Sequence, residues 1–209
     1  MPSDDTPRPE KRRLTPRGTQ RRLQLIELAT AKFAADGYHP TSVADIVDGL
    51  GVGKGVFYWY FDSKETIFEE ILRGAQKQLR TAQQLATAGT KDPIERLAQG
   101  VRASVIWSAS NPDLVTLFDF AQTDERFSNL VRAGRTVLIN DTAAVLREAI
   151  KARRIPANDA DLLAYAILGV STQLTMVHFQ KQEKSPQTIA DVVVQFCLQG
   201  IGARQPSSV

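Results

Sequence analysis

The sequence predicts an all-α protein of about nine helices, with a small N-terminal part and a larger C-terminal part. Apolar residues recur at helical spacing from residue 23 to residue 202, and no segment alternates as a half-buried strand does. Proline and glycine residues separate these periodic segments, as they commonly do between helices. With 209 residues, the chain can form one domain, or one small and one larger domain.

The composition is that of an ordinary globular protein, with 43% hydrophobic residues, 23% charged residues and a mean hydropathy of −0.22. The longest wholly apolar run, residues 162–170, is shorter than the roughly 20 residues that a membrane helix needs. The single cysteine, Cys197, excludes an internal disulfide framework and a cysteine-cluster metal site. No apolar signal segment follows Met1. We therefore expect a cytoplasmic protein with no membrane partner, metal or cofactor.

Positive charge is concentrated near the N-terminus. The net charge is only +3, yet residues 8–22 carry seven basic side chains against Glu10 alone, whereas residues 27–70 hold eight acids and three bases. Residues 1–20 are rich in proline and charge, so we expect a flexible basic arm, with the fold beginning near Gln20. This arm could follow the minor groove of DNA or be a solvated tail.

The N-terminal part predicts three helices in order. The first spans residues 23–35 and ends at Gly37. The second is short, is capped by Thr41 and Ser42, and has its apolar residues between 43 and 50. The third is also short and spans residues 53–61, after a turn bounded by Gly49 and Gly51.

The C-terminal part predicts six longer helices. The first opens at Asp62, in a capping box with Glu65, and ends near Gly89. The second begins at Asp92-Pro93 and the third at Asn111-Pro112. The last three span residues 126–152, 159–179 and 186–202.

Two short helices around a glycine-bounded turn, behind a longer helix, are the arrangement of a helix-turn-helix reader of DNA. The major groove is about 12 Å wide, and the leading edge of the recognition helix must come close to the bases. Glycines on both sides of Lys54 permit that approach, and Lys54 can reach a phosphate or a guanine. Tyrosine hydroxyls and the amides at the helix starts near Thr41 and Lys64 can bind phosphates.

The expected DNA-contacting residues are Arg17, Arg21, Thr41, Ser42, Gly53, Lys54, Gly55, Val56, Tyr58, Trp59, Tyr60 and Lys64. Three of them have a structural alternative. Tyr60 could close the core, Lys54 could be a solvated lysine, and Trp59 could be an exposed packing residue.

A family resemblance rests on a run of residues from 22 to 72. It is carried by Leu25-Ile26, Ala29, Phe33, Gly37-Tyr38, Thr41-Ser42-Val43, Ile46, the segment from Gly51 to Phe61, and Ser63-Lys64-Glu65. With this spacing the segment resembles the DNA-binding domain of the TetR family of bacterial transcription regulators. The resemblance implies a homodimer that binds a palindromic operator, usually represses, and releases DNA when a small ligand enters the C-terminal domain.

The chain departs from the family pattern at three positions. The family usually has serine or threonine where this chain has Gly53, and alanine where it has Val47. Trp59 stands at a variable, DNA-facing position. These departures leave the operator sequence open, and glycine in place of a capping side chain costs only a few tenths of a kcal/mol.

The C-terminal helices carry aromatic and neutral polar residues that could line a mostly apolar ligand cavity or simply fill the core. The candidates are Trp107, Phe118, Phe120, Asn140, Tyr165, Gln173 and Met176. The scarcity of acids on these stripes argues against a cationic ligand. The last two helices resemble the family's dimer-forming pair, with expected interface residues Ala166, Gly169, Val170, Val177, His178, Val193, Phe196, Cys197 and Gly200.

The sequence thus predicts an arm over residues 1–20, a DNA-binding domain over 21–67 and a ligand-binding and dimerisation domain over 68–204. We expect a repressor that is released by a small, largely apolar ligand. Regulation without a ligand, or activation, stays open. An enzyme is not expected, because the chain shows no nucleophile elbow, no phosphate-binding glycine loop and no metal-spaced His/Cys set.

Overall fold

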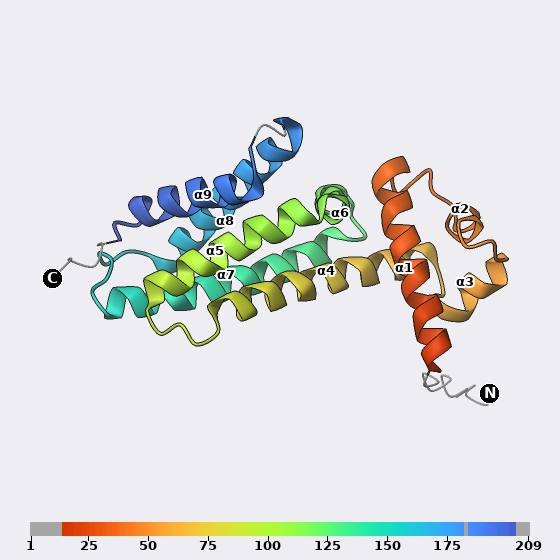
Figure 1. Cartoon of the computed structure of the whole chain (residues 1–209), viewed down its shortest axis with the longest axis horizontal. Coiled ribbons are helices and arrows are strands. Elements are labelled where there is room, and N and C mark those ends of the chain that lie inside the picture. Colours follow the sequence, from red (N-terminus) through yellow and green to blue (C-terminus); the bar gives the residue numbers. More distant parts are fainter. Residues whose placement is uncertain (1–13, 182–183, 204–209) are drawn as a thin grey trace, which may run out of the picture. The chain divides into compact units, whose positions relative to one another are not determined.

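The computed structural model describes residues 14–181 and 184–203, and of residues 177–181 it describes the main chain only. Within these ranges it contains nine helices and no strand, which confirms the predicted all-α class (Figure 1). The helices are α1 (Pro16–Asp36), α2 (Val43–Asp48), α3 (Lys54–Tyr60), α4 (Lys64–Thr87), α5 (Pro93–Ser110), α6 (Pro112–Thr123), α7 (Ser128–Lys151), α8 (Ala160–Lys181) and α9 (Pro186–Gly200).

The chain divides into two compact units, with the boundary between Ile67 and Phe68. Helix α4 begins in the first unit and continues into the second. No helix among the described residues is both long enough and apolar enough to cross a membrane.

Helix α1 begins earlier than the composition predicts. The hydroxyl of Thr15 accepts a hydrogen bond from the amide of Gly18 at 3.2 Å, and Pro16 occupies the first helical position. A capping threonine followed by proline is a favoured helix start, because the missing N–H of proline needs no partner there. Residues 16–20 are therefore helical and do not belong to an arm, and the rest of the expected arm up to residue 13 lies outside the described residues.

The first unit is held by one small apolar core. Leu25, Ala29 and Phe33 of α1 are buried, as are residues from α2, α3 and the turns beside them: Tyr38, Ile46, Val47, Phe57 and Phe61. Helix α1 ends at Gly37, whose φ of 87° is costly for any residue with a Cβ. Packing around this core fixes α2 and α3 to α1.

Helix α2 opens with a complete capping box. The amide of Asp45 donates to the hydroxyl of Ser42, and the amide of Ser42 donates to the carboxylate of Asp45 at 2.7 Å. Hydrogen bonding of the Asp45 carboxylate to the side chain and main chain of Ser42 lowers the pKa of Asp45 below its ordinary value. The predicted cap at residues 41 and 42 is therefore supplied by Ser42.

The start of α4 differs from the predicted capping box. Ser63, rather than Asp62, caps the helix, since its hydroxyl accepts a hydrogen bond from the amide of Thr66 at 3.2 Å. The carboxylate of Glu65 accepts a tertiary hydrogen bond from the hydroxyl of Tyr38 at 2.8 Å.

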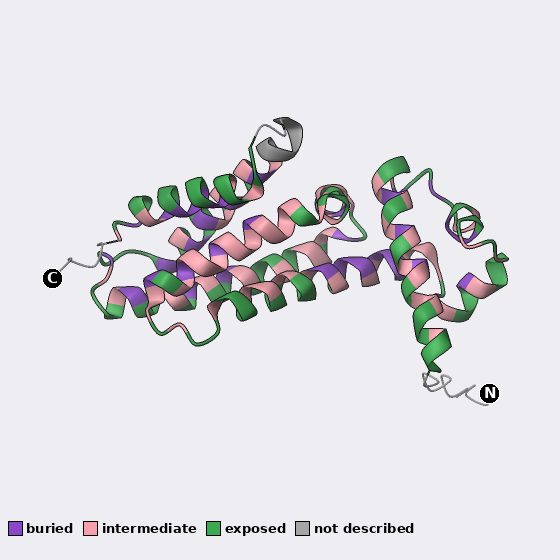
Figure 2. Cartoon of the chain, viewed as in Figure 1, coloured by how far each residue is buried: buried purple, intermediate pink, exposed green. Residues whose placement is uncertain are grey.

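The core of the second unit lies among α5, α7, α8 and α9, whose buried residues form one continuous cluster (Figure 2). Helix α5 starts as predicted, with Asp92 accepting hydrogen bonds from the amides of Ile94 and Glu95, and Asp92 also pairs with Arg154. Beside this core, Phe68, Phe120 and Phe127 form an aromatic cluster in which the rings of Phe68 and Phe127 have centroids 4.6 Å apart.

Candidate DNA-binding surface and ligand cavity

Helix α3 has one buried and one exposed side. Phe57 is fully buried, whereas the neighbouring Tyr58 and Trp59 have 55% and 66% of their surface exposed. Lys54 and Gly55 are exposed and Val56 is half-buried. Two exposed aromatic rings and a lysine on a single short helix form a surface that can stack and donate hydrogen bonds, which suits contact with DNA.

The glycines at the start of α3 leave the surface open. A Cβ added at Gly53 or Gly55 would meet no heavy atom of the described residues within 4 Å. No side chain in that part of the chain caps α3 at Gly53, as expected from the departure at this position. The packing of the protein therefore does not require glycine at either position.

Tyr60 is half-buried and differs from Tyr58. A Cβ at Gly18 would lie 3.6 Å from its hydroxyl oxygen, which places that hydroxyl beside the first turn of α1. Arg17 is exposed on the same turn and Arg21 is half-buried one turn later. The basic start of α1 and the end of α3 therefore lie next to each other, which the composition of the two segments did not predict.

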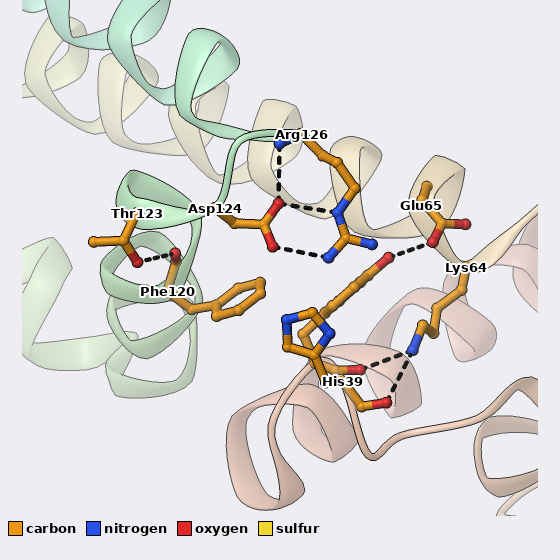
Figure 3. Close-up of polar contacts among 8 residues, drawn as sticks. His39, Lys64, Glu65, Phe120, Thr123, Asp124 and Arg126 are labelled. Atoms are coloured by element: carbon orange, nitrogen blue, oxygen red, sulfur yellow. Dashed lines mark hydrogen bonds and ion pairs between the residues drawn. The ribbon is translucent and has the colours of Figure 1, made fainter.

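The side chains of Thr41 and Lys64 are engaged inside the first unit. Thr41 is 2% exposed and its hydroxyl donates to the carbonyl oxygen of Gly37 at 2.7 Å. The ammonium group of Lys64 donates to the carbonyl oxygens of Tyr38 and His39 at 2.9 and 3.3 Å (Figure 3). It also donates to the carbonyl oxygen of Thr41 at 2.9 Å. Both side chains are therefore occupied within this unit, and the expected contact of phosphates with the main-chain amides near them stays a prediction.

The second unit contains an elongated cavity of about 480 Å³, lined by residues from α4, α5, α6, α7 and α8. Along α5 the lining extends from Arg96 to Ser108 at spacings of three and four residues, so the cavity follows the helix axis. Most of its wall is apolar, with Leu97, Val101 and Val105 on the floor. Its volume lies in the usual range for a site that encloses a small molecule.

Three of the seven expected ligand residues line this cavity, namely Trp107, Phe118 and Met176. Four do not. Phe120 faces the aromatic cluster with Phe68 and Phe127, and the structure places Asn140, Tyr165 and Gln173 at exposed positions away from the lining. These four are corrected, because helical periodicity alone did not indicate which face of each helix borders the cavity.

Sequence reasoning missed the charged residues of the cavity. Arg80, Arg96, Asp119, Arg135 and Asp141 line it, so acids are few there, as expected, but two are present beside three arginines. Arg80 pairs with Asp141 at 3.1 Å, and Arg96 pairs with Glu148. Burial raises the pKa of Asp119, whose carboxylate accepts one hydrogen bond, from the amide group of Gln122 at 3.2 Å.

Helices α4 and α7 approach closely at a glycine. The amide group of Gln76 donates to the carbonyl oxygen of Leu130 at 3.3 Å, and a Cβ at Gly134 would lie only 2.1 Å from the same nitrogen. Both Gln76 and Gly134 line the cavity. A change inside the cavity can therefore reach α4 through this contact.

The outer side of α8 and α9 is apolar and exposed. Phe196 and Val192 on α9 have 59% and 46% of their surface exposed, and Leu162 and Tyr165 on α8 have 64% and 53% (Figure 2). Of the expected interface residues, Ala166, Gly169 and Gly200 are exposed on these helices and Val170 is half-buried. Val193 and Cys197 are corrected, because they are buried in the core of their own subunit, and the side chains of Val177 and His178 lie outside the described residues.

Two family models match the chain. One, described as bacterial regulatory proteins of the tetR family, covers residues 25–71, and the other, described as a tetracyclin repressor-like C-terminal domain, covers residues 90–201. The first contains α2, α3 and most of α1, and the second contains α5 to α9. The sequence motifs indicated a likeness to this family for residues 22–72, and the second family model shows that the likeness covers the C-terminal part as well.

Curated relatives show the same likeness. The HTH-type transcriptional repressor KstR2 of Mycobacterium tuberculosis is 43% identical over 77 residues, which are 37% of this chain and only 38% of KstR2. The HTH-type transcriptional regulator YdgC of Bacillus subtilis is 25% identical over 194 residues, covering 88% of this chain and 94% of YdgC. Among solved structures, the ketosteroid transcriptional regulator KstR2 of M. tuberculosis superposes with a TM-score of 0.73 at 27% identity, covering 88% and 96% of the two chains.

Proposed function

Since this chain belongs to the TetR family of bacterial transcription regulators and carries its DNA-binding helix-turn-helix, we propose that it is a repressor that binds a palindromic operator as a homodimer. In the same proposal, a small and largely apolar ligand enters the second unit and releases the operator.

The observation that carries the proposal is the exposed side of α3. Tyr58 and Trp59 point away from the core that holds Phe57, and Lys54 lies one turn before Tyr58. Large aromatic side chains on a free surface are costly unless a partner covers them. A DNA major groove is a partner that accepts all three, with Lys54 and Tyr58 on phosphates or base edges and Trp59 on a sugar or base.

Basic residues next to this surface supply the attraction to phosphate. Arg17 is exposed on α1, close to the end of α3, and the charged residues that follow between residues 27 and 70 are mostly acidic. Affinity for DNA depends strongly on such charges, so the basic N-terminal stretch should contribute much of the salt dependence of binding.

The ligand part of the proposal rests on the cavity and on α4. Helix α4 contributes Gln76, Arg80 and Gln83 to the cavity, and its first turn is tied to the helix-turn-helix by Lys64 and Glu65. A ligand that displaces α4 would change the spacing of the two recognition helices in a dimer. They must stay about 34–36 Å apart, one turn of DNA, to occupy both half-sites.

The dimer part rests on the outer side of α8 and α9. An apolar side of this kind on two adjacent helices is typical of a subunit interface. Two copies that pack these helices together would cover Phe196 and Val192 and would relate two helix-turn-helix units by a two-fold axis, which matches a palindromic operator.

A mobility-shift titration with duplexes from the region upstream of the protein's own gene tests the proposal. We expect a complex of one dimer with a duplex that contains a two-fold motif. Lys54→Ala should weaken this complex about tenfold or more. It should also reduce the slope of log affinity against log salt concentration by about one, the contribution of one phosphate contact. Lys77→Ala, on the exposed side of α4, should change neither the affinity nor the slope. Failure to bind any such duplex, or a monomer by light scattering at micromolar concentration, would contradict the proposal.

Two alternatives differ only in regulation. A regulator without an inducer would keep its operator affinity whatever compound is added, and the cavity of about 480 Å³ favours a ligand over this alternative. Activation differs from repression in the position of the operator relative to the promoter, so a transcription assay on that promoter separates the two.

A further inference from the structure

The charged groups of the cavity differ in how fully they are compensated. Arg80 pairs with Asp141, and one terminal nitrogen of Arg96 pairs with Glu148, while the buried Nε of Arg96 has no hydrogen-bond partner among the described residues. Arg135 is exposed, so water solvates its guanidinium group. Asp119 is the remaining carboxylate of the lining, and among the described residues it has no ion-pair partner, only the neutral amide of Gln122.

A carboxylate in this position is unfavourable in the empty protein. Removing a charge from water costs free energy unless an opposite charge or several hydrogen bonds replace the solvent. The partly buried Asp119 has one neutral donor, at 3.2 Å, and its pKa is raised by the loss of solvent. A cationic group that enters the cavity would supply the missing compensation.

The surroundings of Asp119 suit a cation that carries carbon substituents. Phe118 precedes it on α6, and Trp107 lies at the end of α5, where its carbonyl oxygen accepts a hydrogen bond from the side chain of Asn111 at 2.7 Å. Trp107 near the end of α5, and Phe118 and Asp119 on α6, all line the cavity, and α6 follows α5 directly after Asn111. Aromatic faces attract ammonium groups, most strongly where water is excluded.

The rest of the cavity suits a long apolar tail. From Ser108 to Arg96 the lining follows α5 for twelve residues, or about 18 Å at 1.5 Å per residue. The wall along this path is formed by Leu97, Val101 and Val105, with Leu138 and Val145 from α7. A linear hydrocarbon chain can lie along this path.

We propose that the effector is a cationic amphiphile, with an ammonium head beside Asp119 and the aromatic end of α5 and α6, and a linear apolar tail that follows α5 toward Arg96. This inference rests on the proposed role of the cavity as the effector site. It replaces the unspecified apolar ligand by a chemical class, and it is opposite to the charge preference that the sequence suggested.

Ligand binding is measured on the full chain without DNA, so its outcome is independent of operator binding. The chain has two tryptophans, and Trp59→Phe leaves Trp107 in the cavity as the only indole reporter. Decyltrimethylammonium, decanoate and decanol are titrated below their micelle concentrations, and the fluorescence of Trp107 is followed. We expect the ammonium compound to bind at least tenfold more tightly than the other two, and affinity to rise several-fold per methylene from octyl to dodecyl tails.

The variants identify the head-group site. Asp119→Asn, which keeps the shape of the side chain, should weaken decyltrimethylammonium about tenfold or more and leave decanol unchanged. Asp113→Asn, at an exposed position on the same helix outside the lining, should change neither. Decanoate or decanol binding as tightly as the ammonium compound, or an Asp119→Asn variant with unaltered ammonium affinity, would overturn the inference.

Operator release is then followed by mobility shift with the unaltered chain. We expect decyltrimethylammonium to release the duplex from the unaltered chain and to fail with Asp119→Asn. If the chain binds the ammonium compound through Asp119 but binds no duplex, the proposed regulator function fails and the ligand class stands. If it binds duplex but no ammonium compound, only the ligand class fails.

Discussion

The ammonium group of Lys64 lies 4.4 Å from the centre of the Tyr38 ring and donates a hydrogen bond to the carbonyl oxygen of the same residue at 2.9 Å. Glu65, the next residue, accepts the hydrogen bond of the Tyr38 hydroxyl. The first turn of α4 thus holds both ends of one buried tyrosine, and through it the turn that leads from α1 to α2. The first turn of α4 is in this way anchored within the first unit.

Replacing Lys64 tests this anchor. Lys64→Met removes three charge-assisted hydrogen bonds and leaves carbonyl oxygens without their donor, so we expect a loss of about 1–3 kcal/mol in the free energy of unfolding. Lys77→Met, on the exposed side of the same helix, should change it by less than about 0.5 kcal/mol. Urea denaturation of both variants measures the difference, and equal stabilities would show that Lys64 is not an anchor.

Replacing Gly55 by alanine should raise stability and weaken DNA binding. Alanine at this helical position is expected to stabilise the fold by about 0.5–1 kcal/mol, because no described atom lies within 4 Å of the added Cβ. The same methyl group would keep α3 away from the groove and weaken operator binding. Thermal melts and mobility shifts on one preparation give both quantities. Unchanged operator affinity would mean that α3 does not approach DNA at Gly55.

Gly134 should connect the cavity to α4. In Gly134→Ala the added Cβ must displace the side chain of Gln76, which breaks its hydrogen bond to Leu130, while the gain in helix propensity offsets the loss. We expect stability to change by less than about 1 kcal/mol and ligand-induced operator release to be altered.

Gly74→Ala provides the matched control on α4. No described atom lies within 4 Å of a Cβ there, so this variant should gain about 0.5–1 kcal/mol and keep its ligand response. If the two alanine variants respond to the ligand alike, the contact between Gln76 and Gly134 does not transmit the signal. Calorimetry gives the stabilities and mobility shift gives the response.

Cys197 should be chemically silent in the folded protein. Burial raises its pKa to about 11 from an ordinary value of 9.0, so at pH 8 almost no thiolate is available. The unfolded chain releases its thiol proton at lower pH than the folded chain, so this residue lowers stability as the pH rises from about 9 to about 11. Reaction with a disulfide reagent at pH 8 should be slow for the native chain and fast in urea. Fast labelling of the native chain would place the thiol at the surface.

The order of the helices could be predicted from sequence because each has an apolar period and an identifiable start or stop, such as Asp92-Pro93 or Gly37. The predicted start of the first helix, at residue 23, is later than the observed start of α1 at Pro16. Thr15-Pro16 is a good cap signal, but the charge and proline content of the surrounding segment pointed to an arm. At the start of α4 the cap is supplied by Ser63 rather than by Asp62.

Part of the site could not be predicted from sequence. Phe118 and Phe120 are two residues apart on α6, which turns them about 200° from one another around the axis, and only packing determines that Phe118 faces the cavity. Val193 and Phe196 are likewise both apolar residues of α9. Periodicity marks such residues as candidates for burial without indicating which neighbour buries them.

Helix α9 is apolar on two sides, one against its own core and one outward. A helix of this kind reaches its lowest free energy only when it is enclosed on both sides. If pairing of two copies encloses it, the population of folded chains follows mass action, and the melting temperature rises with protein concentration. A cell that makes few copies would then lose them to proteolysis faster than one that makes many, so the abundance of this regulator would feed back on its own lifetime.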